Sequence, residues 1–202
     1  MLHQSAVPLT LWQTLLELQK PLSHSGFFLA GGTSLALRLG HRLSVDLDFF
    51  TSESFEPQVL ANNLNIGPES ITGIADGTLQ IRINDIKVEF LKHSYPKLAE
   101  IEEIEGIKIG SLPDVAAMKI NAIANRGSKK DFYDLAALLA IHPLETILSF
   151  YQKKYQPATL LMAIRSLAWF DDAETEPDPI SLTTESWPDI VNQIKNAVRQ
   201  LS

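Results

Sequence analysis

The spacing of apolar residues changes character near residue 110 of the chain. Before that point, apolar residues form short runs or alternate with polar ones, which indicates strands with a few short helices between them. After it, apolar residues recur every three or four positions, which indicates helices. We therefore predict an α+β fold, with an α/β core at 1–110 and a helical domain at 111–202.

Apolar periodicity and turn residues together set the expected elements of the first half. The predicted strands are Phe27–Ala30, Val45–Phe50, Thr78–Ile83, Lys87–Leu91 and Ile107–Ile109, and the predicted helices are Leu9–Gln19, Thr33–Leu39 and Pro57–Leu64. Pro21 is expected to limit the first helix, and Asn84–Ile86 to join two strands as a hairpin. Glu100–Glu105 is predicted to be an acidic surface stretch.

The second half is predicted to be helical apart from an acidic, proline-containing loop at Asp171–Pro179. Ser111 and Ser128 each precede an Asp by three positions, a pattern typical of helix N-terminal caps. The predicted helices are Leu112–Arg126, Lys129–Ile141, Leu144–Tyr155, Ala158–Phe170 and Trp187–Leu201.

Composition narrows the class of protein. The 202 residues are 45% hydrophobic and 20% charged, which favours a folded core. The formal net charge of −7 argues against a general nucleic-acid-coating protein, although a local basic patch could still hold RNA. The chain has no cysteine, no basic-apolar leader and no long apolar run, so we expect a cytoplasmic protein without a membrane span.

Two aspartates alternate with apolar residues in the strand predicted at Val45–Phe50. Alternation places Asp46, Asp48 and Phe50 on one face and Val45, Leu47 and Phe49 on the other. Hard carboxylate oxygens suit Mg²⁺ or Mn²⁺, although two ordinary surface acids would give the same pattern. Glu89, on a later strand, can add a third carboxylate, and three such groups suit two-metal phosphoryl transfer. Taken alone, Glu89 is more readily interpreted as a surface acid.

Gly31 and Gly32 lie between the first strand and the first short helix of this region. Glycine allows close backbone approach to a ligand, and a helix N-terminus presents free N–H groups to phosphate. Thr33 or Ser34 can add a hydroxyl donor. The Gly31–Ser34 segment therefore predicts a triphosphate site, whereas a Gly-Gly pair alone would indicate only a turn.

A second polar group is predicted on the helices that follow residue 111. Helical periodicity places Lys119 and Arg126 on the inner face, where a cation needs an anionic partner. A triphosphate and a protein carboxylate are both suitable partners. Asp131, at the start of the next helix, is either a residue favoured by the helix dipole or one that orients Lys119 or Arg126.

These segments resemble the polymerase-β-type nucleotidyltransferase superfamily and, more closely, the AbiEii/AbiGii toxin family of type IV toxin–antitoxin systems. The first motif of the resemblance is Gly31–Leu37, His41-Arg42 and Ser44–Phe49. The second is Lys119 followed by Arg126, Lys130, Asp131, Asp134 and Leu135. Glu89 stands where the superfamily more often has Asp, and the last 60 residues or so carry no matching motif.

The resemblance implies a polymerase-β-type core, a small mixed sheet with flanking helices, and Mg²⁺- or Mn²⁺-dependent transfer of NMP from an NTP to an acceptor hydroxyl. It implies catalytic roles for Asp46, Asp48, Glu89, Lys119 and Asp131, with Asp46, Asp48 and Glu89 as metal ligands. The helical domain at 111–202 is therefore expected to complete the active site. It implies nucleotide-binding roles for Gly31, Gly32, Thr33, Ser34, Arg42, Ser44, Lys119 and Arg126. It further implies a toxin that acts on RNA, in particular tRNA, and a cognate antitoxin as protein partner.

Two other functions fit the same residues. The acceptor can be a small molecule such as an aminoglycoside, or a protein hydroxyl; net acidity and an aromatic content of 8% favour a cationic small acceptor. Alternatively, the chain can be a catalytically silent nucleotide- or partner-binding module, which the retained acids and Lys119 argue against. The five scattered histidines are interpreted as structural or surface residues, with His41 the one to test, and Trp169-Phe170 as core or interface.

Overall fold

The computed structural model describes residues 1–155 and 160–201, and the chain divides into two compact units. The first unit comprises Met1–Arg38, Ser44–Tyr95 and Ile101–Gly110. The second comprises Leu39–Leu43, Pro96–Glu100 and Ser111–Ser202. Two short segments of the first half of the sequence therefore belong to the helical unit. The predicted α+β class is confirmed.

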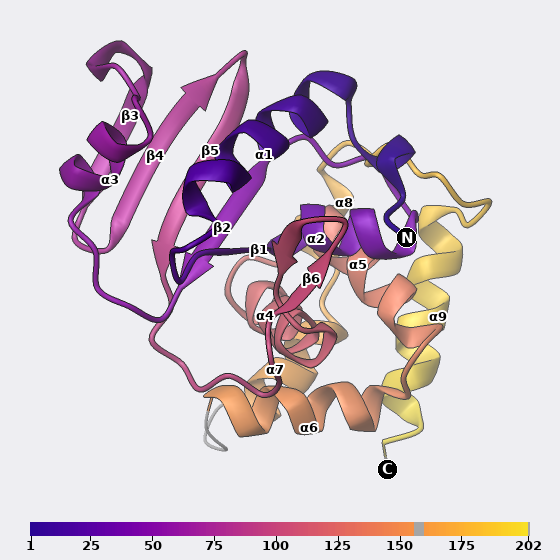
Figure 1. The fold of residues 1–202 in the computed structure, drawn as a ribbon. Coiled ribbons are helices and arrows are strands. Elements are labelled where there is room, and N and C mark those ends of the chain that lie inside the picture. The colour runs from indigo at the N-terminus through magenta and orange to yellow at the C-terminus, as the bar shows by residue number, and fades with distance from the viewer. Residues whose placement is uncertain (156–159, 202) are drawn as a thin grey trace. The chain divides into compact units, whose positions relative to one another are not determined.

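The first unit is built on a mixed β-sheet, which has seven strands within the described residues, in the order β3-β4-β5-β2-β1-β7-β6 (Figure 1). The β1/β7 and β2/β5 pairs are parallel and the other pairs antiparallel. The elements are η1 (Gln4–Ala6), α1 (Leu9–Leu22), β1 (Phe28–Ala30), α2 (Gly31–Leu39), β2 (Leu47–Thr51), α3 (Pro57–Asn63), η2 (Pro68–Ser70), β3 (Ile71–Ala75), β4 (Thr78–Ile83), β5 (Ile86–Lys92), β6 (Glu102–Ile104) and β7 (Ile107–Ile109).

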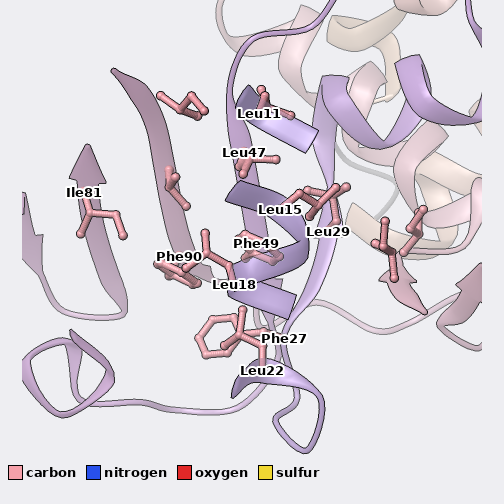
Figure 2. Close-up of a cluster of buried hydrophobic side chains, with 14 of the residues drawn as sticks. Leu11, Leu15, Leu18, Leu22, Phe27, Leu29, Leu47, Phe49, Ile81 and Phe90 are labelled. Atoms are coloured by element: carbon pink, nitrogen blue, oxygen red, sulfur yellow. The ribbon is translucent and has the colours of Figure 1, made fainter. Parts of the chain in front are cut away.

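Helix α1 covers one face of the sheet and supplies much of the core of this unit (Figure 2). Leu11, Leu15, Leu18 and Leu22 form a continuous buried stripe along it. The helix runs past the predicted end because Leu22 extends this stripe, so Pro21 lies inside its last turn. On the sheet side, the Phe49 ring of β2 stacks on that of Phe90 in the neighbouring strand β5, with centroids 5.2 Å apart.

The β4/β5 hairpin closes with a two-residue turn at Asn84-Asp85, and Ile83 pairs with Ile86. Both turn residues have positive φ, at 51° and 64°, as a type I′ turn requires. This turn fixes the register of β5, and through it the position of Glu89. The predicted hairpin is confirmed, although Ile86 belongs to the strand.

The structure differs from the sequence-based prediction at several elements of the first unit. Strand β2 begins at Leu47, so Val45 lies outside it and is 54% exposed rather than buried beside Leu47. Helix α2 begins at Gly31, so the Gly-Gly pair is the first turn of a helix rather than a separate turn. Strand β3 was not predicted, and β6 occupies part of the expected acidic surface stretch.

The second unit consists of helices packed around α4 (Figure 1). Helix α4 contacts α5, α6 and α7, and α5 also packs against α9. Its elements are α4 (Leu112–Asn125), α5 (Lys129–Leu139), α6 (Leu144–Tyr155), α7 (Leu160–Leu167), α8 (Asp171–Glu174) and α9 (Trp187–Arg199). The start predicted at Ala158 lies outside the described residues. The loop predicted at Asp171–Pro179 is wrong in its first part, because Asp171–Glu174 form the short helix α8, in which Ala173 is buried.

The two predicted serine caps have different outcomes. The Ser111 side chain accepts a hydrogen bond from the Asp114 backbone N–H at 3.2 Å, as predicted for α4. The Ser128 side chain instead donates to Glu176 at 2.8 Å, and the same carboxylate accepts from the Lys129 N–H. A glutamate 47 residues further along the chain therefore caps α5, which local spacing did not predict.

Among the described residues, no single helix is long and apolar enough to cross a bilayer. Helices α5 and α6 pass a test of length and composition only as a pair, and they meet at a bend of 116°.

Candidate active site

The acidic candidates of the first unit lie where β2 and β5 run side by side. In this parallel pair Asp48 is the register partner of Glu89. Leu47 and Phe49 are fully buried while Asp48 is half-buried, so the predicted alternation of β2 is present. Asp46 is also half-buried and lies just before the strand. The sheet thus places Glu89 next to Asp48, with Asp46 two residues upstream.

The start of helix α2 lies against one of these carboxylates. A Cβ atom built on Gly31 would be 2.8 Å from Asp48 Oδ2, and the φ of Gly31 is +67°. Both facts require glycine, because a side chain would collide with the carboxylate and strain the backbone. The first N–H groups of an α-helix have no partner within the helix, so an anion held there would lie close to Asp48.

The hydroxyls predicted to touch phosphate make internal contacts. Thr33 and Ser44 are buried, their Oγ atoms are 2.8 Å apart, and Thr33 also donates to the Asp46 carbonyl oxygen. Ser34 is fully buried and donates to the Gly31 carbonyl at 2.8 Å. These three side chains fix the chain on either side of the site, so a ligand at α2 would meet backbone N–H groups.

Two residues that sequence analysis assigned no role hold the Glu89 carboxylate. Gln80 on β4 donates to Oε1 at 2.6 Å, and Lys87 on β5 donates to Oε2 at 2.8 Å. The hydrogen bond with Glu89 raises the pKa of Lys87; burial opposes this, and the charges of Glu89, Asp48 and Asp46 add to it. The negative charges of all three predicted metal ligands therefore favour the charged form of the Lys87 ammonium. The Lys87-x-Glu89 spacing was the available signal in the sequence, since alternate residues of a strand share a face.

The donor set has the chemistry expected for Mg²⁺, because carboxylate oxygens are its preferred protein ligands. Gly31 also lets the start of α2 approach the Asp48 carboxylate closely. Within residues 1–155 and 160–201, however, no three His, Cys, Asp or Glu side chains are gathered into a potential metal site. Asp46 and Asp48 therefore fit a metal, whereas Glu89 as third ligand stays a prediction.

The helical unit contains a buried ion-pair network centred on Asp134, which is fully buried. Its Oδ1 accepts from Arg42 Nε and lies 2.7 Å from His41 Nε2, while its Oδ2 accepts from Arg42 Nη2 at 2.9 Å. Lys119 Nζ is also 2.7 Å from Oδ2. The predicted inward orientation of Lys119 is present, and protein carboxylates are its partners.

Asp131 joins the same network and contacts both basic residues of the second motif. Lys119 Nζ donates to Oδ1 at 2.9 Å, and Arg126 Nε donates to Oδ2 at 2.8 Å. The Arg126 side chain is 56% exposed at the end of α4, so its predicted placement on the inner face is wrong. Helix α4 ends at Asn125, and from the cap position Arg126 reaches Asp131 at the start of α5.

Burial and ion pairing act in opposite directions on these groups. Burial alone raises the pKa of Asp134, but Lys119 and Arg42 hold that pKa well below its usual range. Burial likewise raises the pKa of Asp131, and Lys119 and Arg126 lower it further than burial raises it. Burial lowers the pKa of Lys119, but the charges of Asp134 and Asp131 raise it above its ordinary value. The Asp131 and Asp134 carboxylates and the Lys119 ammonium are therefore all charged near neutral pH.

His41 was interpreted as a structural or surface residue, and the structure places it 5% exposed inside this network. Asp134 was named only as part of the second motif and given no role, and it proves to be the centre of the network. The two are 93 residues apart in sequence, so no spacing pattern could pair them. Trp169, by contrast, is 57% exposed while Phe170 is buried, so the core interpretation holds for Phe170 alone.

The chain shares its fold with nucleotidyltransferases of known structure. A Helicobacter pylori protein described as a nucleotidyltransferase has a similar structure, with a TM-score of 0.60 and 19% identity over 98% of this chain and 95% of its own. MenT4, a nucleotidyltransferase toxin of Mycobacterium tuberculosis H37Rv, gives a TM-score of 0.53 and 17% identity over 92% and 82%. At these identities, the likeness shows a shared fold.

The sequence comparisons define the family. Residues 13–77 and 72–200 match the model of the family described as nucleotidyl transferase AbiEii toxin, type IV TA system. The uncharacterized protein aq_aa25 of Aquifex aeolicus is 38% identical over 157 residues, which cover 74% of this chain and 76% of that protein. The chain belongs to the AbiEii nucleotidyltransferase toxin family.

Proposed function

We propose that this nucleotidyltransferase uses a divalent cation, Mg²⁺ or Mn²⁺, to transfer NMP from an NTP to a hydroxyl of an RNA, in particular a tRNA. One observation carries the proposal: the first turn of α2 lies directly against the Asp48 carboxylate, which itself neighbours Glu89. A phosphate-binding helix end beside cation-binding oxygens is the combination that phosphoryl transfer requires.

Each residue has a defined part in this proposal. The N–H groups of Gly31 to Ser34 hold phosphate oxygens of the NTP, while Thr33 and Ser44 fix the chain that carries Asp46. Asp46 and Asp48 hold the cation, and Glu89 serves as third ligand and accepts the proton of the acceptor hydroxyl. When bound, the cation neutralises phosphate charge and orients the leaving pyrophosphate. The residues of the site thus act by positioning and charge stabilisation.

We retain Lys119, Asp131, Arg42 and Arg126 as residues on which nucleotide binding and activity depend. Their support is the family pattern and the network that they form within the helical unit. Asp131 holds the ammonium of Lys119 and the guanidinium of Arg126, and Asp134 holds Arg42. Because these contacts bury most of the charge, they define the conformation of the unit as much as any ligand contact.

The acceptor is tested by incubating the protein with each α-labelled NTP, Mg²⁺ and one of three acceptors: total tRNA, an aminoglycoside mixture, or the protein alone. We expect label on tRNA with wild type and none with Asp46→Asn. Label on the aminoglycosides or the protein would replace RNA as the acceptor and keep the chemistry. NTP binding without transfer to any acceptor would instead indicate a silent binding module. Co-purification with a tagged protein encoded beside this one would test the antitoxin partner.

A further inference from the structure

The Glu89 carboxylate is occupied at both of its oxygens. Gln80 Nε2 lies 2.6 Å from Oε1 and Lys87 Nζ lies 2.8 Å from Oε2. The side chain of Glu89 is 16% exposed, while that of Lys87 is 46% exposed. One partner is therefore a neutral amide and the other a cation that solvent can reach.

Gln80 belongs to a row of residues that crosses four strands. Gly73 pairs with Gln80, Gln80 with Glu89, and Glu89 with Asp48. A Cβ built on Gly73 would lie 2.7 Å from Gln80 Oε1, so the missing side chain makes room for the amide. Strand β3 thus shapes the place from which Gln80 reaches Glu89.

Lys87 faces the whole acidic group rather than Glu89 alone. Its ammonium lies 2.8 Å from Glu89 Oε2, and Glu89 is the register partner of Asp48 on the neighbouring strand. An ammonium therefore lies within the field of the three carboxylates that a divalent cation would use. A divalent cation at Glu89 Oε2 would compete with the ammonium for that oxygen, and the two positive charges would repel each other.

We propose that Lys87 is the resident counter-ion of the acidic group, which a divalent cation displaces from Glu89 while Gln80 keeps the carboxylate in place. This inference rests on the proposed function, because it concerns the same metal-binding carboxylates. Lys87 and Gln80 are positioning residues in this scheme. Lys87 limits metal affinity and protects the carboxylates from mutual repulsion when no metal is bound, whereas Gln80 keeps Glu89 oriented in both states.

The inference predicts that a Lys87 variant binds Mn²⁺ more tightly, whereas simple structural damage would weaken binding. Removing the Lys87 charge abolishes its competition with the metal, so Lys87→Met should bind Mn²⁺ more tightly. A unit charge and a divalent ion about 6 Å apart in a water-like dielectric repel enough to change affinity on the order of tenfold. Lys87→Arg retains the charge and should stay within about twofold of wild type.

Lys92 offers a matched control on the same strand. Its ammonium contacts the Ser54 hydroxyl at 2.9 Å rather than a carboxylate, and Lys92→Met changes the net charge by the same amount. Free Mn²⁺ is measured by electron paramagnetic resonance in titrations of the full chain without nucleotide. Gln80→Leu should weaken binding several-fold, since Glu89 loses its fixed donor.

The outcomes separate the inference from the proposed function. Tighter binding by Lys87→Met, with Lys92→Met and Lys87→Arg near wild type, supports the inference. Equal affinity of Lys87→Met and Lys92→Met, with clear binding by wild type and loss in Asp48→Asn, overturns the inference alone. Absence of Mn²⁺ binding in every variant, wild type included, overturns the inference together with the metal site of the proposed function.

Discussion

Asp134→Asn should be among the most destabilising single substitutions in the helical unit. The native carboxylate is fully buried and faces the Arg42 guanidinium, the Lys119 ammonium and the His41 imidazole. Asparagine keeps the shape, but it removes the negative charge and presents an NH₂ group to partners that are themselves donors. Two permanent buried cations then lose their shared counter-charge.

The magnitude follows from burial. Breaking a buried ion pair by removing one partner costs about 3–5 kcal/mol, because the remaining charge stays desolvated. Asp131 still faces Lys119, which offsets part of the loss at that ammonium, whereas Arg42 loses both hydrogen bonds of its bidentate contact with Asp134. We therefore expect a loss of about 3 kcal/mol or more in the free energy of unfolding of this unit.

Urea unfolding monitored by tryptophan fluorescence provides the assay. A Trp12→Phe background leaves Trp169 and Trp187, which both belong to the helical unit. Trp187 is buried and stacks on Tyr133 with ring centroids 6.1 Å apart, so its fluorescence reports on the folding of that unit. The matched control is Asp178→Asn, which breaks a Lys–Asp pair whose carboxylate is 64% exposed and should cost at most about 1 kcal/mol. A loss below about 1 kcal/mol for Asp134→Asn would refute the reasoning.

Three further predictions concern pH, the glycine turn and a helix cap. The folded pKa values of Asp131 and Asp134 are lowered, so the stability that these groups contribute is complete above their unfolded pKa of about 3.9. That contribution is lost as pH falls below this value, and unfolding midpoints between pH 6 and pH 3 should show a smaller drop for Asp134→Asn than for wild type. Gly31→Ala should lower the free energy of unfolding by at least about 1 kcal/mol and weaken Mn²⁺ binding, because its Cβ would displace the Asp48 carboxylate; unchanged values would contradict this close approach. Ser111→Ala should cost about 1 kcal/mol in urea unfolding through loss of the α4 cap, and a neutral result would remove the cap's assigned role.

The sequence predicted those elements whose residues repeat one pattern. Alternation of Leu47, Asp48 and Phe49 predicted β2, and the turn residues Asn84 and Asp85 predicted the hairpin, because both signals are local. Strands β3 and β6 escaped prediction for a physical reason. Strand β3 contains Gly73 and has no buried residue, and β6 is an exposed, acidic edge strand, so neither shows an apolar face.

The contacts of the candidate site were harder to predict than its residues. The inward position of Lys119 followed from helical periodicity, but its partner Asp134 came from a different helix, and Arg42 and His41 from a segment more than 90 residues earlier. The contact between Gln80 and Glu89 depends on strand register, which spacing within one strand does not reveal. Motifs thus predict which residues belong to the candidate site, whereas contacts between distant segments can be found only from the three-dimensional structure.

The most direct test of the proposed chemistry is transfer of labelled NMP by wild type, Asp48→Asn and Asp76→Asn under identical Mg²⁺ and tRNA. Both substitutions remove one negative charge. Asp48 lies against the first turn of α2, whereas Asp76 is an exposed acid of the turn between β3 and β4, so only the first should affect the site. We predict transfer by wild type and Asp76→Asn that stops when EDTA is added, and a loss of at least about 100-fold in Asp48→Asn. Transfer by Asp48→Asn at the wild-type rate, or transfer unaffected by EDTA, would contradict the central claim.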